Sequence, residues 1–259
     1  MRKLFTLTAA TAVVLALPAA ALADGHTETF TAQIGQANET GASATADLSL
    51  DGNDLTVAID GDGFFDGFPH AMHFHGEPGG DNVCGPLNPG DAGFEEADVD
   101  GDGFLSVVEG VPAYGAVTVS LTTEGDTSPD SALAVDRFPT SSTLDYARTF
   151  EVSDEVAANL SSLHIVIHGA DLNGSGEIGD LENEDGTLKE SSLDPDLPFE
   201  ATAVAACGQI VTAGTDTGPD TGAGGTAPAT NNTGGLLAGL LALGGLGTIA
   251  ARRRGTVTA

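Results

Sequence analysis

Basic residues are scarce in this sequence. Its 259 residues include 8 Lys and Arg against 38 Asp and Glu, and the formal net charge is −30. Five basic residues flank two terminal hydrophobic segments, so only Arg137, Arg148 and Lys189 lie between them, together with all the acidic residues. Phosphate attraction requires a basic patch, which excludes nucleic acid as a natural partner. The acidity instead favours divalent cations, a high-salt habitat or both.

Other common signals are also missing. No stretch has the period of a long amphipathic helix, and only 155–163 indicates one or two helical turns. No glycine loop suits phosphate, no nucleophile motif supports a hydrolase, and no feature indicates a protein partner. Cysteine is limited to Cys84 and Cys207, for which a disulfide is the default if the chain is exported.

The beginning of the chain predicts export. Arg2 and Lys3 precede an apolar run that ends at Ala21-Leu22-Ala23, a small-x-small cleavage site, so 1–23 is predicted to be a signal peptide. Cleavage there would leave Asp24-Gly25-His26 at the new N-terminus. An α-amine, two amides and an imidazole in this order form a square-planar set for Cu(II) or Ni(II), although chance also produces the tripeptide.

The end of the chain predicts attachment to the cell envelope or membrane. Residues 213–233 are rich in Gly, Thr, Ala and Pro and are predicted to be a flexible linker. Residues 234–251 are uncharged and mostly apolar, and about 18 residues span roughly 27 Å as a helix, enough for a bilayer core. Three arginines follow, so 252–259 is predicted to be a cytoplasmic tail. A degenerate sortase signal around Asn232-Thr233-Gly234 is the alternative to a membrane anchor.

The region 24–212 is predicted to be a single all-β domain. Segments of alternating polarity are separated by turn residues such as Asp51-Gly52-Asn53-Asp54, a pattern typical of an antiparallel sandwich or barrel. About eight strands are predicted, at 29–34, 44–50, 55–59, 70–75, 115–122, 146–152, 163–168 and 201–211.

Five histidines fall on two of these predicted strands. His73 and His75 share one strand face, with His70 nearby, and His164 and His168 share a face of a later strand. Neighbouring imidazoles on rigid strands are half of a metal site. A single strand histidine more often faces solvent or binds the backbone, but two pairs favour metal binding.

Two segments match the twelve-residue calcium loop of EF-hand type. The first, 98–109, has a glycine at position 6 and predicts five calcium ligands: Asp98, Asp100, Asp102, the Phe104 carbonyl and Glu109. The second, 171–182, predicts Asp171, Asn173, Ser175, the Glu177 carbonyl and Glu182. An acidic, glycine-rich chain also produces such strings as solvated loops, but two full matches favour calcium. The flanks of both are expected to be strand and loop.

Short motifs resemble the copper/zinc superoxide dismutase family in their order along the chain. They are His73-Phe74-His75, 84–89 (Cys-Gly-Pro-Leu-Asn-Pro), 165–171 (Ile-Val-Ile-His-Gly-Ala-Asp) and 206–210 (Ala-Cys-Gly-Gln-Ile). Residues 44–76 also resemble the chordin-type CHRD domain. The resemblance implies an eight-stranded Greek-key β-sandwich and a Cys84–Cys207 disulfide. It also implies that His73, His75 and His168 match three copper ligands.

The sequence departs from the dismutase pattern where zinc would bind. Gly85-Pro86-Leu87-Asn88-Pro89 has no bridging histidine, and no histidine lies between His75 and His164, so zinc is not expected. The arginine that guides the anionic substrate is Val204 here. The two calcium loops stand where the family's zinc and electrostatic loops would be, which suggests that calcium replaces zinc in ordering them.

These observations lead to two expectations about function. The first is a surface-anchored, calcium-stabilised, CHRD- or dismutase-like metal-binding module without catalytic activity. The alternative is a copper-only dismutase-like oxidoreductase or a copper-binding protein. The strong negative charge disfavours the alternative, because it repels superoxide.

Overall fold

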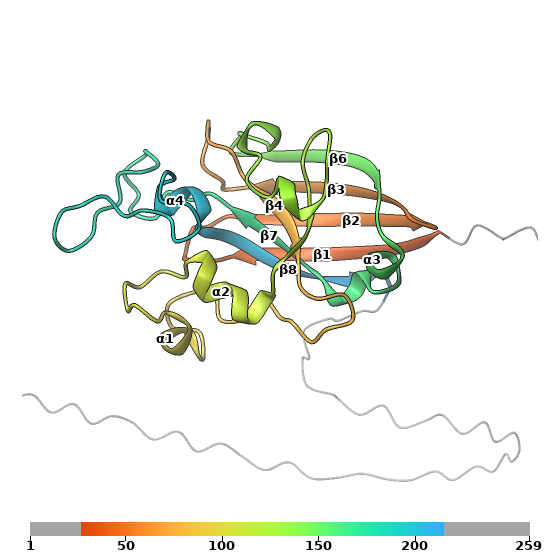
Figure 1. Ribbon diagram of the computed structural model, residues 1–259, viewed down its shortest axis with the longest axis horizontal. Coiled ribbons are helices and arrows are strands. Elements are labelled where there is room, and N and C mark those ends of the chain that lie inside the picture. The colour runs from red at the N-terminus through yellow and green to blue at the C-terminus, as the bar shows by residue number, and fades with distance from the viewer. Residues whose placement is uncertain (1–26, 215–259) are drawn as a thin grey trace, which may run out of the picture. The chain divides into compact units, whose positions relative to one another are not determined.

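The computed structural model describes residues 27–214, which form an all-β fold. Eight antiparallel strands lie in the order β5-β4-β7-β8-β1-β2-β3-β6 in one curled sheet (Figure 1). The strands are β1 (Glu28–Gln36), β2 (Ser43–Asp51), β3 (Asp54–Asp62), β4 (Met72–His75), β5 (Val117–Ser120), β6 (Leu144–Glu151), β7 (His164–His168) and β8 (Val204–Thr212). The all-β prediction is therefore confirmed.

Strict polar/apolar alternation explains the long strands of the sheet. In β3, Leu55, Val57 and Ile59 are fully buried, while the residues between them are exposed or half-buried. A two-residue turn joins β2 to β3, and its Gly52 has a positive φ of 62°, which suits the tight hairpin. The alternating side chains thus form the main core on one face of these strands.

Strands β4 and β7 are buried on both faces. Met72, Phe74, Ile165 and Ile167 point into the main core. The opposite face of these two strands carries the histidines, because side chains alternate along a strand. Insertions before β5 and β8 cover this second face (Figure 1).

Short helices occupy the insertions and the connections. The α-helices are α1 (Phe94–Ala97), α2 (Val107–Tyr114), α3 (Asp154–Ala158) and α4 (Phe199–Thr202), and the 3₁₀ helices are η1 (Pro129–Ser131), η2 (Val135–Arg137) and η3 (Leu160–Ser162). The last strand begins at Val204 and not at the predicted residue 201, because α4 occupies the residues before it.

The expectation of strand and loop around the first calcium-type loop is wrong. Helix α1 ends at Ala97, directly before Asp98, and α2 begins at Val107 inside the motif. Ser106 and Glu109 form a capping box, in which each side chain accepts the other residue's backbone N–H. This Ser-x-x-Glu spacing was a readable signal for a helix start.

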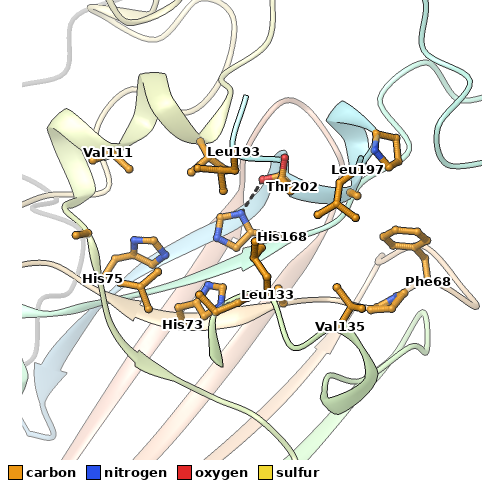
Figure 2. Close-up of a pocket in the computed structure, with 18 residues that line it drawn as sticks. Phe68, His73, His75, Val111, Leu133, Val135, His168, Leu193, Leu197 and Thr202 are labelled. Carbon is orange, nitrogen blue, oxygen red and sulfur yellow. Dashed lines mark hydrogen bonds between the residues drawn. The ribbon is translucent and has the colours of Figure 1, made fainter. Parts of the chain in front are cut away.

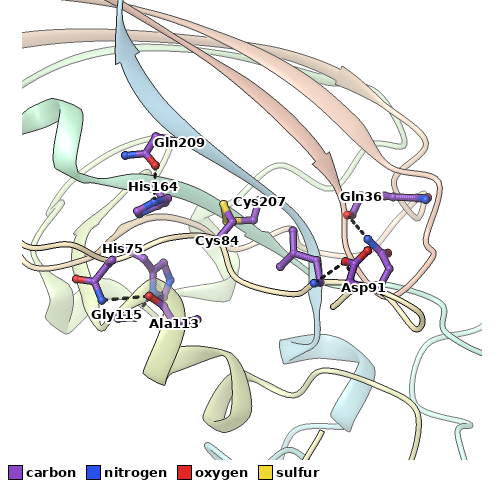
Figure 3. Close-up of a disulfide and its surroundings, with 12 residues drawn as sticks. Gln36, His75, Cys84, Asp91, Ala113, Gly115, His164, Cys207 and Gln209 are labelled. Atoms are coloured by element: carbon purple, nitrogen blue, oxygen red, sulfur yellow. Dashed lines mark hydrogen bonds between the residues drawn. A yellow bond between two sulfur atoms is a disulfide. The ribbon is translucent and has the colours of Figure 1, made fainter. Parts of the chain in front are cut away.

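A disulfide fixes the first insertion to the sheet (Figure 3). Cys84 and Cys207 are bonded with their Cα atoms 5.9 Å apart, which confirms the expected pairing. Buried Asn38 makes a second attachment, since its side chain donates to the carbonyls of Leu105 and Val204 and accepts from the Leu105 N–H. The segment that leads to α2 is thereby held against β8.

The terminal predictions lie outside the described residues. These are the signal segment 1–23, Asp24-Gly25-His26, the linker beyond residue 214, the apolar run 234–251 and the tail 252–259. Within 27–214, no helix is long and apolar enough to cross a membrane.

Candidate metal centre

Strands β4 and β7 bring His73, His75 and His168 together (Figure 2). In the antiparallel register His73 lies opposite Val166, two residues before His168 on the same strand face. One ring nitrogen of each histidine lies within 4.8 Å of those of the other two. The three side chains therefore form a compact cluster of the kind that can hold one metal ion.

Backbone carbonyls set the orientation of each ring. The rings contact carbonyl oxygens through His73 Nε2 (Ala132, 3.0 Å), His75 Nδ1 (Gly115, 2.9 Å) and His168 Nδ1 (Thr202, 2.9 Å). A carbonyl only accepts, so these nitrogens carry the protons of the neutral rings. The lone pairs then belong to His73 Nδ1, His75 Nε2 and His168 Nε2.

Two of these lone pairs are buried without a partner. Within residues 27–214, neither His73 Nδ1 nor His75 Nε2 has a hydrogen-bond partner, and both atoms are inaccessible to solvent. Buried polar atoms are nearly always satisfied, so these two nitrogens stand out as acceptors that a ligand could use. The pattern of one nitrogen on a carbonyl and the other free is that of metal-bound histidine.

Burial keeps the three rings neutral. Desolvation, with a smaller contribution from the neighbouring histidines, lowers the pKa of His73 well below its usual range. The same main cause lowers the pKa of His75 to about 3 and that of His168 to about 4. Neutral imidazole is the form that binds metal, so at neutral pH the three rings have the protonation state that a metal ion would require.

The other two predicted histidines do not join the cluster. His70 is buried with Nδ1 3.2 Å from the His168 carbonyl and Nε2 2.8 Å from that of Phe65, so it supports the backbone at His168. His164 Nε2 lies 3.2 Å from Gln209 Oε1 on β8 (Figure 3). Neither belongs to the cluster of histidine nitrogens that lie within 4.8 Å of one another, although His164 Nδ1 is also buried without a hydrogen-bond partner among the described residues.

An apolar cavity lies over the histidine cluster (Figure 2). Its volume is about 550 Å³, and His73, His75 and His168 line it. None of the described residues that line it is charged. The Tyr114 ring stands edge-on to His75 at 4.9 Å, beside the cavity.

The three basic residues of the described region form their hydrogen bonds and ion pairs away from the histidine cluster. Arg137 donates to the Glu124 carbonyl and to Ser131, and Arg148 donates to the Thr122 and Gly125 carbonyls. Lys189 pairs with acidic residues of the first loop. None of these three cations lines the histidine cavity, so none is placed to contact an anion inside it.

The first calcium-type loop brings its carboxylates together. One oxygen each of Asp98, Asp100 and Asp102 lie within 4.8 Å of one another. The Asp98 carboxylate also accepts the Gly101, Asp102 and Gly103 N–H groups, which shapes the turn. Lys189, which sequence reasoning missed, pairs with Asp102 and lies 3.8 Å from Asp100. Its ammonium offsets part of the negative charge that a cation would neutralise.

Glu109 closes this first loop. Its Oε1 accepts the N–H of Val99 at 2.7 Å, and its Oε2 accepts that of Ser106 at 3.0 Å. The carboxylate thus bridges positions 2 and 9 of the motif. Phe104, at position 7, donates its N–H to the Asp102 carboxylate at 2.8 Å.

In the second loop a different glutamate makes the equivalent contacts. Glu200, fully buried in α4, accepts the N–H of Leu172 at 2.9 Å and that of Gly179 at 2.7 Å, again at positions 2 and 9. Glu182 instead lies exposed in an isolated bridge with Leu188. Only the fold could reveal this exchange, because Glu200 lies 21 and 28 residues from the two N–H groups that it accepts.

Asp171 and Asp180 organise the turn of the second loop. The Asp171 carboxylate accepts the Ser175 and Gly176 N–H groups. Asn173 and Ser175 donate to Asp180, a residue that the motif had not selected. Glu177 is exposed, and its carbonyl accepts from the Ser175 hydroxyl.

No known family model and no curated protein matches this chain. The class that the fold and the site define is therefore an all-β domain with a buried three-histidine cluster and two acidic loops.

Proposed function

We propose that this protein is a metal-binding module in which His73, His75 and His168 bind copper. The orphaned, buried nitrogens of His73 and His75 carry this proposal. Three neutral imidazoles suit several transition metals, copper among them, and the resemblance to the dismutases selects copper rather than zinc. The cluster would supply three nitrogen ligands and leave the side toward the cavity open.

The strand order supports a dismutase- or CHRD-like Greek-key sandwich for this module. Strands β1, β2, β3 and β6 make one half of the order, and β5, β4, β7 and β8 make the other. The connections β3–β4, β5–β6 and β6–β7 each pass between the halves, as Greek-key connections do. The family assignment itself rests on the motifs around His73, Cys84, His168 and Cys207.

A binding role without catalysis accounts best for the surroundings of the cluster. An anionic substrate such as superoxide would need a basic side chain nearby to attract it. Arg137, Arg148 and Lys189 instead contact backbone carbonyls or acidic side chains outside the cavity. The cavity offers no charged group either. A copper-only oxidoreductase is the second candidate, to be tested once copper is found. Export and anchoring at the cell surface are part of the proposal and rest on the predicted terminal segments.

Copper loading is the test of the histidine centre. We expect the purified chain to carry about one copper ion, because one three-nitrogen set is available. The His73→Ala/His75→Ala variant should carry none, as measured by elemental mass spectrometry. The N-terminal amine must be blocked in both proteins, so that Asp24-Gly25-His26 cannot bind copper.

His164→Ala is the matched control for this loss. It removes a buried histidine of the same strand face that lies outside the cluster. Copper should remain bound to it. Equal copper content in all three proteins, or none in the unaltered chain, would contradict the proposed centre.

We also propose that the two acidic loops bind calcium and thereby order the insertions around the centre. We expect about two calcium ions per chain, with dissociation constants on the order of 10⁻⁴ to 10⁻³ M, as for extracellular loops of this type. Asp98→Asn/Asp102→Asn should remove one of them, measured by calorimetric titration. Asp145→Asn, an exposed acid on β6, is the charge control. Titration of the unaltered chain without any heat in millimolar calcium would refute this part.

A further inference from the structure

The cavity over the histidine cluster is larger than a metal ion requires. Its volume of about 550 Å³ falls within the range typical of sites for small organic molecules, roughly 300 to 1,000 Å³. The histidine cluster lies at its wall, and α2, the η1–η2 segment and the segment before α4 surround it (Figure 2). Copper binding alone leaves this space unexplained.

The lining defines the chemistry of an occupant. Apart from the three histidines, the only polar side chain among the described lining residues is Thr202. Its hydroxyl is already engaged with Ser191 at 2.7 Å. A charged occupant would lose its hydration here without gaining an ion pair, which is strongly unfavourable. The lining therefore suits an uncharged molecule.

Exposed apolar side chains gather around the same cavity. Within residues 27–214 only seven large hydrophobic residues are exposed, and three of them, Leu133, Val135 and Leu193, line this cavity. Leu133 is 45% exposed and Leu193 is 49% exposed, although they come from segments distant in the sequence. Apolar side chains that converge on an open cavity mark a binding site.

The histidines provide the one polar end. His73 Nδ1 and His75 Nε2 are buried acceptors without partners, and both residues line the cavity. A hydroxyl group can donate to such a nitrogen once a shift of the ring exposes it to the cavity. The rest of the wall can only make van der Waals contacts, so the polar group of an occupant has to lie at this end.

We infer that the cavity binds an uncharged, largely apolar alcohol or phenol, with its hydroxyl group toward His73 and His75. The inference uses the metal-free nitrogens of His73 and His75 only to orient the hydroxyl, and it does not rest on the proposed copper centre. The apolar wall and the exposed residues around it stand without any metal. The occupant is thus a neutral small molecule and neither superoxide nor another anion.

Equilibrium dialysis with naphthol and with the naphthoate anion tests this inference. The two probes have nearly the same size and differ in charge. The full chain, in its metal-free form, should bind naphthol at one site and bind naphthoate at least about tenfold more weakly, a difference of about 1.4 kcal/mol. Leu133→Asp and Leu193→Asp should each weaken naphthol binding about tenfold.

Val83→Asp is the control, because Val83 is 54% exposed and does not line the cavity. It should leave naphthol binding unchanged, and circular dichroism should show all variants folded. Equal binding of the two probes, or naphthol binding that neither leucine substitution weakens, would overturn the inference. Naphthol binding that appears only after 234–251 is deleted would also overturn it, because the chain's own segment would then fill the cavity.

The two proposals fail separately in these experiments. A chain that binds naphthol at the cavity but no copper would refute the metal centre and leave the neutral-ligand site standing. A chain that carries copper on the three histidines but, once stripped of metal, binds no naphthol would refute the ligand site alone.

Discussion

Removal of the disulfide is expected to lower the free energy of unfolding by about 4 to 5 kcal/mol at 25 °C. Cys84 and Cys207 are 123 residues apart in the sequence, so their bond greatly restricts the unfolded chain. In the folded state it attaches the first insertion to the middle of β8, where Cys207 lies opposite both Val166 and Gly35. The double variant Cys84→Ala/Cys207→Ala should therefore melt roughly 8 to 20 °C below the unaltered protein.

Urea unfolding followed by circular dichroism measures this loss. Reduction of the unaltered protein with dithiothreitol is the matched control, because it opens the bond without changing a residue. Both treatments should give the same stability. A loss below about 1 kcal/mol would show that the hydrogen bonds of Asn38 are sufficient to hold the insertion against β8.

The metal-free protein is expected to lose stability as the pH falls from about 6.5 toward 4. An unfolded histidine has a pKa near 6.5, whereas burial lowers the pKa to about 3 for His75 and about 4 for His168. Between these values the unfolded chain binds more protons than the folded chain, so acid favours unfolding. Each pKa unit is worth about 1.4 kcal/mol, so the titration of His168 alone should lower the free energy of unfolding by about 3 kcal/mol over this pH range.

His168→Gln isolates the histidine contribution from that of the many carboxylates. Carboxylate titration remains in the variant, while one buried proton acceptor is removed. Urea unfolding between about pH 7 and pH 4.5 should therefore show a weaker pH dependence in the variant than in the unaltered protein. Equal slopes in both proteins would mean that His168 is not held neutral by the fold.

The local sequence was sufficient for the strands and the disulfide. Each of the eight strands overlaps a predicted segment, because polar/apolar alternation is a local property that burial on one face imposes. The helices were harder to predict. Helix α4 has only four residues, too few to show a helical pattern of polar and apolar side chains, so its formation depends on the surrounding structure. Helix α2 had a readable capping box, Ser106 to Glu109, inside the calcium motif.

The composition of the candidate site depended on partners distant in the sequence. Side chains alternate along a strand, so the sequence places His164 and His168 on the same face of β7 and makes them equally good candidate ligands. Only His168, however, contacts the Thr202 carbonyl and turns toward His73. His164 turns to Gln209 instead. At the second loop, Glu200 makes the contacts that were expected of Glu182, again because a residue distant in the sequence folds against the loop.

The sequence by itself determined that this protein is an acidic all-β chain with two cysteines, paired histidines and two carboxylate loops. These properties follow from composition and from patterns of a few residues. Only the tertiary structure decided which histidines converge, which carbonyls orient their rings, and that an uncharged apolar cavity lies beside them. Those features arise from strand register and from insertions that meet across more than 100 residues of sequence, as in the Cys84–Cys207 pair with its separation of 123 residues. No local pattern encodes such contacts.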